Sequence, residues 1–206
     1  IRELRLAYKL FEPYAERRKV TMFGSARTLP TKAEYQQALD FARKISAAGW
    51  MVITGAGPGI MQAGHEGAGK ENSFGANIRL PWEQSANPVI QNDEKLITFK
   101  YFFTRKLTFI RHSDAIVLFP GGFGTMDELF ELLTLVQTRK SSKKMPIVLY
   151  GRAFWSEVLN FDALIRWGTI SAADLSLFHV ADTPDEAFTY LTRELSSLYG
   201  DKDAEL

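Results

Sequence analysis

The stretch VLFPGGFGTMDELFE, Val117 to Glu131, decides the fold class. An apolar run ends at Pro120, a turn with three glycines follows, and a helical pattern that carries acids begins directly after it. A strand that passes through glycines into a helix is the building unit of parallel α/β sheets. The stretch also raises the question whether Glu128 serves chemistry or only caps the helix.

Working outward, the same alternation of strand and helix runs along the whole chain. The patterns predict strands within residues 19–25, 50–55, 74–80, 95–100, 114–120, 145–151 and 177–182. They predict a first helix that stops before Pro13, and further helices over 31–48, 58–69, 101–113, 125–139, 153–167 and 184–198. Pro58 is interpreted as the first residue of its helix.

Three of these strands have continuously apolar cores: MVIT (51–54), AIVLF (115–119) and PIVLY (146–150). Such runs are typical of strands that are buried on both faces. The chain is therefore predicted to be α/β, a single doubly wound, Rossmann-like parallel sheet with helices on both faces. We expect one domain over residues 1–206, because no linker or repeat divides the chain.

The bulk composition narrows the function classes. The formal net charge is +1 and there is no cysteine. The charge gives no general field for nucleic acid or membrane, and thiolate chemistry is excluded. No apolar run reaches the roughly 18 residues of a membrane span. We expect a cytoplasmic protein, and we interpret the first helix, within residues 1–16, as the end of a trimmed segment because the chain begins at Ile1.

Glycine turns follow three of the predicted strands, where ligands bind in such sheets. They contribute the candidates Gly24 and Ser25, then Gly55, Gly57 and Gly59, then Gly121, Gly122 and Gly124. Free N–H groups at the start of the following helix favour an anion such as phosphate. The third glycine of the dinucleotide fingerprint is missing, and the segment where its ribose-binding acid is expected carries Arg79 instead. A mononucleotide therefore fits better.

Two interpretations of Glu128 remain open. Thr125 and Glu128 match a capping box, in which the glutamate bonds back to the helix start. Alternatively, Glu128 carries chemistry one turn from the phosphate loop. In the preceding helix, which we expect to be mostly buried, Lys106 and Arg111 are expected to reach the surface, whereas Arg105 lies nearer the glycine edge.

The segment TRKLTFIRHSDAIVLFPGGFGTMDE resembles the signature of the LOG ("Lonely Guy") family of cytokinin-nucleotide phosphoribohydrolases, formerly called "lysine decarboxylase-like". The Arg105-Lys106 pair and Pro120–Glu128 match its R-K and P-G-G-x-G-T-x-x-E pattern, and GSAR and GAGPGIMQAGHEGA extend the resemblance over roughly residues 20–180. The resemblance implies hydrolysis of the N-glycosidic bond of purine nucleoside 5′-monophosphates, either AMP or N6-isoprenoid nucleotides, without a cofactor. It also implies a homodimer or larger assembly.

On this basis Arg105 and Glu128 are the predicted catalytic residues. The predicted substrate- and phosphate-binding residues are Gly24, Ser25, Gly55, Gly57, Gly59, Arg79, Lys106, Gly121, Gly122, Gly124 and Thr125. We expect no metal site, no nucleic-acid or membrane partner, structural roles for His65 and His112, and packing roles for Met61 and Phe123.

Several alternatives remain. A protein of this fold can be a nucleotide or molybdenum-cofactor carrier without activity. Amino-acid decarboxylation would need a buried lysine, whereas Lys140, Lys143 and Lys144 are expected to be exposed. The sequence does not decide the preferred base. Trp82, Phe102, Phe103 and Phe109 are candidates for a pocket around an apolar tail or, alternatively, for core positions.

Overall fold

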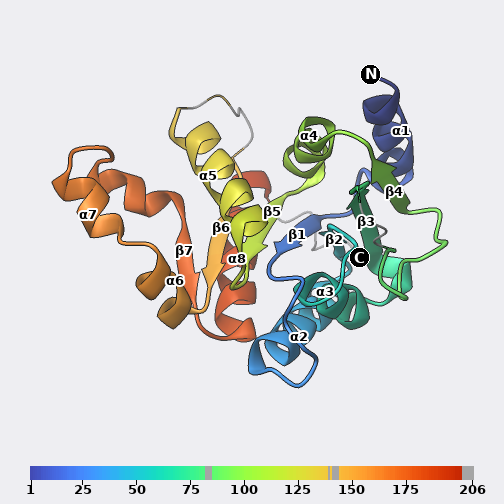
Figure 1. Ribbon diagram of the computed structural model, residues 1–206, viewed down its shortest axis with the longest axis horizontal. Helices are drawn as coiled ribbons and strands as arrows, with labels where there is room; N and C mark the ends of the chain where they lie inside the picture. Colours follow the sequence, from blue (N-terminus) through green and yellow to red (C-terminus); the bar gives the residue numbers. More distant parts are fainter. Residues whose placement is uncertain (82–84, 139, 141–143, 201–206) are drawn as a thin grey trace.

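The computed structural model describes residues 1–81, 85–138, 140 and 144–200, and the fold is an α/β sandwich around one parallel sheet (Figure 1). The sheet has seven strands in the order β4-β3-β2-β1-β5-β6-β7, and every pair of neighbours is parallel. The strands are β1 Lys19–Phe23, β2 Met51–Thr54, β3 Ser73–Ile78, β4 Leu96–Phe99, β5 Ala115–Leu118, β6 Ile147–Tyr150 and β7 His179–Ala181. The predicted doubly wound, Rossmann-like sheet is confirmed.

The topological switch point of the sheet lies between β1 and β5, because successive strands are added on opposite sides of this pair. From β1 the chain adds β2, β3 and β4 on one side, and from β5 it adds β6 and β7 on the other. The loops after β1 and β5 therefore diverge at the carboxyl edge of the sheet and leave a crevice between them. Val20 to Phe23 pair with Ala115 to Leu118, so both strands end at the same level.

Helices cover both faces of the sheet. They are α1 Arg2–Phe11, α2 Ala33–Ala47, α3 Ile60–Ala68, α4 Phe102–His112, α5 Phe123–Gln137, α6 Arg152–Val158, α7 Phe161–Arg166 and α8 Pro184–Tyr199, with 3-10 turns at Glu12–Tyr14, Lys70–Asn72 and Ala172–Leu177. Figure 1 places α2, α3 and α8 on one face and α1, α4 and α5 on the other.

The continuously apolar strand β5 shows why both faces must be covered. Ala115 and Val117 belong to the core beneath α2, α3 and α8, whereas Ile116 and Leu118 belong to the core beneath α1, α4 and α5. All four side chains are fully buried. A strand of this kind has no face for solvent, because successive side chains point to opposite sides of the sheet.

Three predicted helices differ from the observed ones. The helix expected over 153–167 is two helices, because the side chain of Asn160 accepts a hydrogen bond (2.9 Å) from the amide of Ala163 and starts α7 anew. The helix after β2 begins at Ile60, so Pro58 precedes it. The helix after β5 begins at Phe123, two residues earlier than predicted.

The prediction of a mostly buried α4 was also wrong. Thr104, Thr108 and Phe109 are buried, but Phe102, Phe103 and Leu107 are about half or more exposed. Apolar residues lie on more than one face of this helix, so the sequence does not say which face meets the sheet.

Candidate functional site

The three predicted glycine turns meet at the crevice between β1 and β5. The amide of Ser25 donates to the carbonyl of Pro120 (3.0 Å), and the amide of Ile60 donates to the carbonyl of Ser25 (3.0 Å). Gly59 has φ +67°, and a Cβ there would lie 2.2 Å from the Ser25 carbonyl oxygen. Glycine is thus needed at position 59 for the third turn to pack on the first.

A cavity of about 730 Å³ opens at this junction. Its lining includes eight predicted site residues: Gly24, Ser25, Arg105, Gly121, Gly122, Gly124, Thr125 and Glu128. These residues come from the loop after β1, from α4, and from the loop that leads into α5 and its first turns, which are far apart in sequence. A larger hollow of about 1040 Å³ lies at the opposite edge of the sheet, around Lys19 and Asp114, where strands begin. In doubly wound sheets it is the carboxyl edge that forms ligand sites.

Gly122 and Gly124 are not required by the fold. Neither has a positive φ, and a Cβ added at either position would meet no atom within 4 Å. Gly121 differs, because a Cβ there would lie 2.1 Å from the Oγ1 of Thr125. Glycines without a conformational or packing reason leave a bare backbone that a ligand can approach closely.

The backbone at this point is the amino end of α5. Within the described chain, no acceptor is found for the amides of Gly122, Phe123, Gly124 and Thr125. The first amide to find one is that of Met126, which donates to the Gly122 carbonyl (3.0 Å). Unpaired amides at the positive end of a helix dipole form a site for an anion.

Glu128 lies one turn further along α5 and is only 8% exposed. Burial raises the pKa of its carboxyl to about 7, although the charges of Lys106 and Arg105 oppose the rise. The capping-box interpretation was wrong. Gly122 is the N-cap, no side chain caps the helix, and Thr125 already lies inside it. Glu128 is therefore a buried carboxyl that faces a cavity, and such groups are frequent in active sites.

Arg105 reaches the cavity from α4. Its guanidinium carbon lies 5.3 Å from the ring centre of Phe109, and its Nη2 would lie 2.7 Å from a Cβ at Gly55. Burial lowers its pKa, and the carboxylate of Glu128 opposes the change. The Nε atom is buried, and no group in the described part of the chain forms a hydrogen bond with it. A buried, unpaired donor of this kind is unfavourable until an acceptor arrives, which favours a ligand or water at the site.

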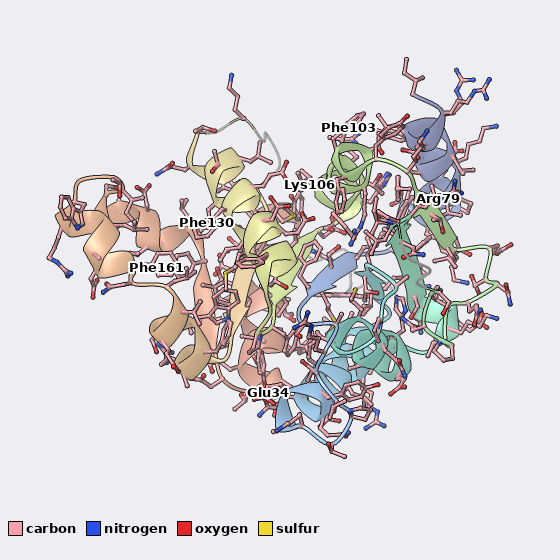
Figure 2. All side chains as sticks on the ribbon, in the orientation of Figure 1. Glu34, Arg79, Phe103, Lys106, Phe130 and Phe161 are labelled. Atoms are coloured by element: carbon pink, nitrogen blue, oxygen red, sulfur yellow. The ribbon has the colours of Figure 1, made fainter. Side chains whose placement is uncertain are left out.

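Five predicted binding residues do not line this cavity. Lys106 lies between α4 and α5 (Figure 2), where its Nζ is 2.8 Å from Asp127 and 2.6 Å from Glu131. Arg79 lies toward α1 and β4 and lines a separate hollow at β3 and β4. Gly55, Gly57 and Gly59 lie behind the lining: Gly55 contacts Arg105, and the Gly57 carbonyl accepts from Asn87 (3.0 Å).

Other lining residues were not among the predicted catalytic or binding residues, although Phe102 was a candidate for the pocket around an apolar tail. Met61, Phe123 and Phe102 line the cavity, as do Phe23, Ala26, Arg27, Met126, Asp127, Phe154 and Val158. Phe154 and Val158 belong to α6, which follows β6 at the same sheet edge. The strand-end rule could therefore have found them, although no glycine-rich signature marks that turn.

The remaining aromatic candidates divide between surface and core. Phe103 is 66% exposed, whereas Phe109 is a fully buried core residue. Trp82 and Lys143 lie outside the described residues. Lys140 and Lys144 are exposed, as expected.

His65 is a structural residue, as predicted. It is fully buried, and its Nε2 lies 3.0 Å from both the Phe74 carbonyl and the Thr54 hydroxyl. Burial lowers its pKa to about 4, so the ring is neutral. His112 stacks on Phe11 at 4.1 Å. Among the residues that the structure describes, no three His, Cys, Asp or Glu side chains are grouped to hold a metal ion.

Together, the fold and the site define a Rossmann-like α/β protein with a glycine-lined cavity at the switch point of its sheet. The chain belongs to the protein family described as "Possible lysine decarboxylase", which matches residues 58–191. This agrees with the LOG resemblance of the sequence.

The chain is also similar in sequence to curated proteins that are described as nucleotide hydrolases. The chain is 25% identical over 181 residues to a "Probable cytokinin riboside 5'-monophosphate phosphoribohydrolase" of Oryza sativa subsp. japonica, a match that covers 85% of this chain and 76% of the rice protein. It is 27% identical over 166 residues to a protein of Arabidopsis thaliana with the same description (78% and 81% covered). A "Pyrimidine/purine nucleotide 5'-monophosphate nucleosidase" of Escherichia coli K12 is 29% identical over 127 residues, which are 57% of this chain and 28% of that protein.

Solved structures show the same fold. The molybdenum cofactor carrier protein of Chlamydomonas reinhardtii superposes with a TM-score of 0.59 at 20% identity, covering 88% of this chain and 99% of that one. DNA processing protein A of Helicobacter pylori superposes with a TM-score of 0.58 at 17% identity (90% and 84% covered). At these identities the likeness concerns the fold alone.

None of the helices in the described ranges combines the length and the apolar character that crossing a membrane requires.

Proposed function

We propose that this protein hydrolyses the N-glycosidic bond of purine nucleoside 5′-monophosphates, AMP or its N6-isoprenoid derivatives, and releases the free base and ribose 5-phosphate. One observation carries the proposal: the bare, unpaired amides at Gly122 and Gly124 lie on the same cavity as the buried Glu128 and Arg105. An anion site beside a carboxyl of raised pKa and a guanidinium suits a phosphorylated substrate that is cleaved through a cationic sugar.

The 5′-phosphate would bind the amides that open α5, with the hydroxyls of Ser25 and Thr125 nearby. This placement would bring the ribose towards Glu128, one turn further along the helix. Arg27, on the loop after β1, supplies a further positive charge to the cavity wall. Binding energy at the phosphate would then fix the sugar against the carboxylate.

In the chemical step, the bond between C1′ and the base nitrogen breaks, and its electron pair leaves with the base. The ribose becomes oxocarbenium-like, and the ionised Glu128 stabilises it and accepts a proton from the attacking water. The departing base gains negative charge, which Arg105 stabilises; the base then takes up a proton from solvent, and Glu128 returns to solvent the proton that it accepted from water. Arg105 lines the same cavity as Glu128, which supports this role.

The descriptions of the rice, Arabidopsis and E. coli relatives support the substrate class, because each names a nucleotide 5′-monophosphate hydrolase. The residues that line the cavity within the described chain include no lysine, so the site offers no amine for a Schiff base with a carbonyl cofactor. The cavity therefore supports decarboxylation less well, whatever the family description suggests.

A carrier function is the alternative, because the same amides would also bind the phosphate of a pterin cofactor. The decisive experiment is to incubate the protein with AMP and to follow adenine by chromatography, alongside Glu128→Gln. Release of adenine by the wild type and not by Glu128→Gln supports the proposal. Tight binding of AMP without cleavage would favour the carrier, and unchanged activity of Glu128→Gln would remove Glu128 from the mechanism.

We further propose that the protein is a homodimer or a larger homo-oligomer. Phe103 and Leu107 are exposed on α4, and Figure 2 shows Phe103 on the outer side of this helix. Phe102 and Phe123 are exposed at the cavity mouth beside them. Exposed groups of large apolar side chains are typical of an interface between subunits. Light scattering should give a mass of at least two chains, and Phe103→Glu should reduce it; a monomeric wild type would contradict this proposal.

A further inference from the structure

The turn that follows β2 carries a buried glycine against which the Arg105 guanidinium packs. A Cβ at Gly55 would lie 2.7 Å from Nη2 of Arg105, 3.7 Å from its Cζ and 2.8 Å from the sulfur of Met61. Real Cβ atoms essentially never approach other atoms within 3.0 Å. Gly55 has no positive φ, so its backbone conformation does not require glycine. Glycine is required because a side chain here would occupy the space of the Arg105 guanidinium.

This turn is held from behind by a buried chain of polar groups. The Ala56 amide donates to the Thr54 hydroxyl (2.9 Å), and the Asn87 amide donates to the Ala56 carbonyl (2.8 Å). Asn87 Nδ2 donates to the Gly57 carbonyl (3.0 Å). Ala56 is held at φ +62°, an unusual conformation for a residue with a side chain. Such a conformation persists only where the surroundings determine it.

The proton positions in this chain follow from its geometry. The Phe74 carbonyl can only accept, so Nε2 of His65, at 3.0 Å, carries the proton. Nδ1 of His65 is then an acceptor, and Nδ2 of Asn87 donates to it (3.0 Å) with its second hydrogen. The Thr54 hydroxyl, which accepts from the Ala56 amide, also lies 3.0 Å from Nε2, so these buried contacts join the turn to β2, α3 and the loop that carries Asn87.

Arg105 also packs on Phe109, whose ring centre is 5.3 Å from the guanidinium carbon. The guanidinium is thus bounded by an aromatic ring and by a side-chain-free backbone. We propose that Gly55, held by the buried Thr54–His65–Asn87 chain, is a positioning residue that sets the direction of Arg105 towards the substrate. This inference rests on the proposed function for its kinetic consequences, but not for its geometry.

The kinetic test is a double-mutant cycle with AMP. Gly55→Ala should lower kcat/KM about 100-fold, the scale expected when a catalytic group is displaced by about 1 Å. In the Arg105→Ala background the same change should alter kcat/KM by less than about twofold, because Gly55 acts only through Arg105. Asn87→Asp, which cannot donate to the Gly57 carbonyl or to His65, should show the same dependence on Arg105.

Met61 provides the control, because the added methyl group would also meet its sulfur. In the Met61→Ala background, Gly55→Ala should lower kcat/KM by the same factor as it does in the wild type. Recovery of activity in that double variant, or equal losses with and without Arg105, would overturn the inference. Thermal unfolding of each variant separates a loss of fold from a loss of position.

A crystal structure of Gly55→Ala tests the geometry whether or not AMP is cleaved. The guanidinium should move by about 1 Å or more from its contact with residue 55 while the turn keeps its path. An unmoved Arg105, with only Met61 displaced, would contradict the inference even in an active enzyme. If the wild type does not cleave AMP but Arg105 moves as expected, the proposed function fails and the positioning role of Gly55 stands.

Discussion

Glycine at positions 122 and 124 is not needed for folding, so ligand binding is the better explanation for it. Neither has a positive φ and neither has a neighbour that a Cβ would touch, so alanine would fit both positions in the unliganded protein. By contrast, a Cβ at Gly24, Gly59 or Gly121 would meet Ile60, Ser25 or Thr125, respectively. Bare backbone without a packing reason is therefore the strongest sign of a ligand at this loop.

The first prediction follows from this difference. Gly124→Ala should raise the free energy of unfolding by about 0.5 kcal/mol, because alanine favours a helix over glycine, and should weaken AMP binding at least about tenfold because its methyl group occupies the anion site. Urea unfolding and calorimetric titration measure the two effects. Gly121→Ala is the matched control, since its methyl group would meet Thr125 and should destabilise the fold. Wild-type affinity in Gly124→Ala would argue against an anion at this loop.

The second prediction concerns the protonation of Glu128, whose pKa burial raises to about 7. If the ionised carboxylate is required, kcat at saturating AMP should be constant above that pH and should fall about tenfold per unit below it. Glu128→Gln should lose at least about 100-fold in kcat at every pH. A break near 4.5, the ordinary pKa of a glutamate, would indicate that Glu128 is not buried as in this structure.

At the scale of elements, the contact between α4 and α5 connects the two predicted catalytic residues. Arg105 and Lys106 are adjacent on α4, but Arg105 faces the cavity while Lys106 binds Asp127 and Glu131 on α5. Burial lowers the pKa of Lys106, but these two acids outweigh it and the pKa is raised. Lys106 thus connects the two helices, whereas Arg105 lines the cavity.

The third prediction tests that division. Lys106→Met keeps the apolar stem and removes the charge, so it should lower the free energy of unfolding by about 1 kcal/mol and change the KM for AMP by less than about twofold. It should also move the break in the kcat profile to higher pH, because the charge of Lys106 lowers the pKa of Glu128. Lys44→Met, which removes the ion pair with Asp185 on the other face of the sheet, should leave the break unchanged. A large rise in the KM for AMP would indicate that Lys106 binds the substrate.

At the scale of the whole molecule, two buried groups give opposite contributions to the dependence of stability on pH. His65 has a lowered pKa of about 4, so its contribution to stability is complete above its ordinary value of 6.5 and is lost as pH falls towards 4. Glu128 has a raised pKa of about 7, so its contribution is complete below its ordinary value of 4.5 and is lost as pH rises through 7. Between 4.5 and 6.5 the two slopes partly cancel.

The fourth prediction separates these contributions. At pH 8 the free energy of unfolding of Glu128→Gln should exceed that of the wild type by up to about 3 kcal/mol. This difference should vanish near pH 4. The stability of Glu128→Gln should then fall more steeply with acid than that of the wild type, because the slope of His65 is no longer opposed. Urea unfolding at pH 4, 6 and 8 measures both effects. Equal stability of the two proteins at pH 8 would contradict the raised pKa.

The sequence by itself determined the alternation of strands and helices and the edge at which the site forms. Apolar runs identify buried strands, and glycines after them mark turns, because both signals are local. Parallel strands present their carboxyl ends at one edge, so Gly24, Ser25, Gly121, Gly122, Gly124 and Thr125 could be predicted to converge. Arg105 and Glu128 could be placed with them from the same reasoning and from the family pattern.

Only the tertiary structure decided the strand order and the side to which each side chain points. Arg79 follows β3, which lies two strands from β1, so it lines a different hollow although it is also at a strand end. Lys106 turns to α5, and Gly55 contacts Arg105 rather than the cavity. Strand order and helix rotation are set by packing between segments far apart in the chain, and residue spacing carries little information about either.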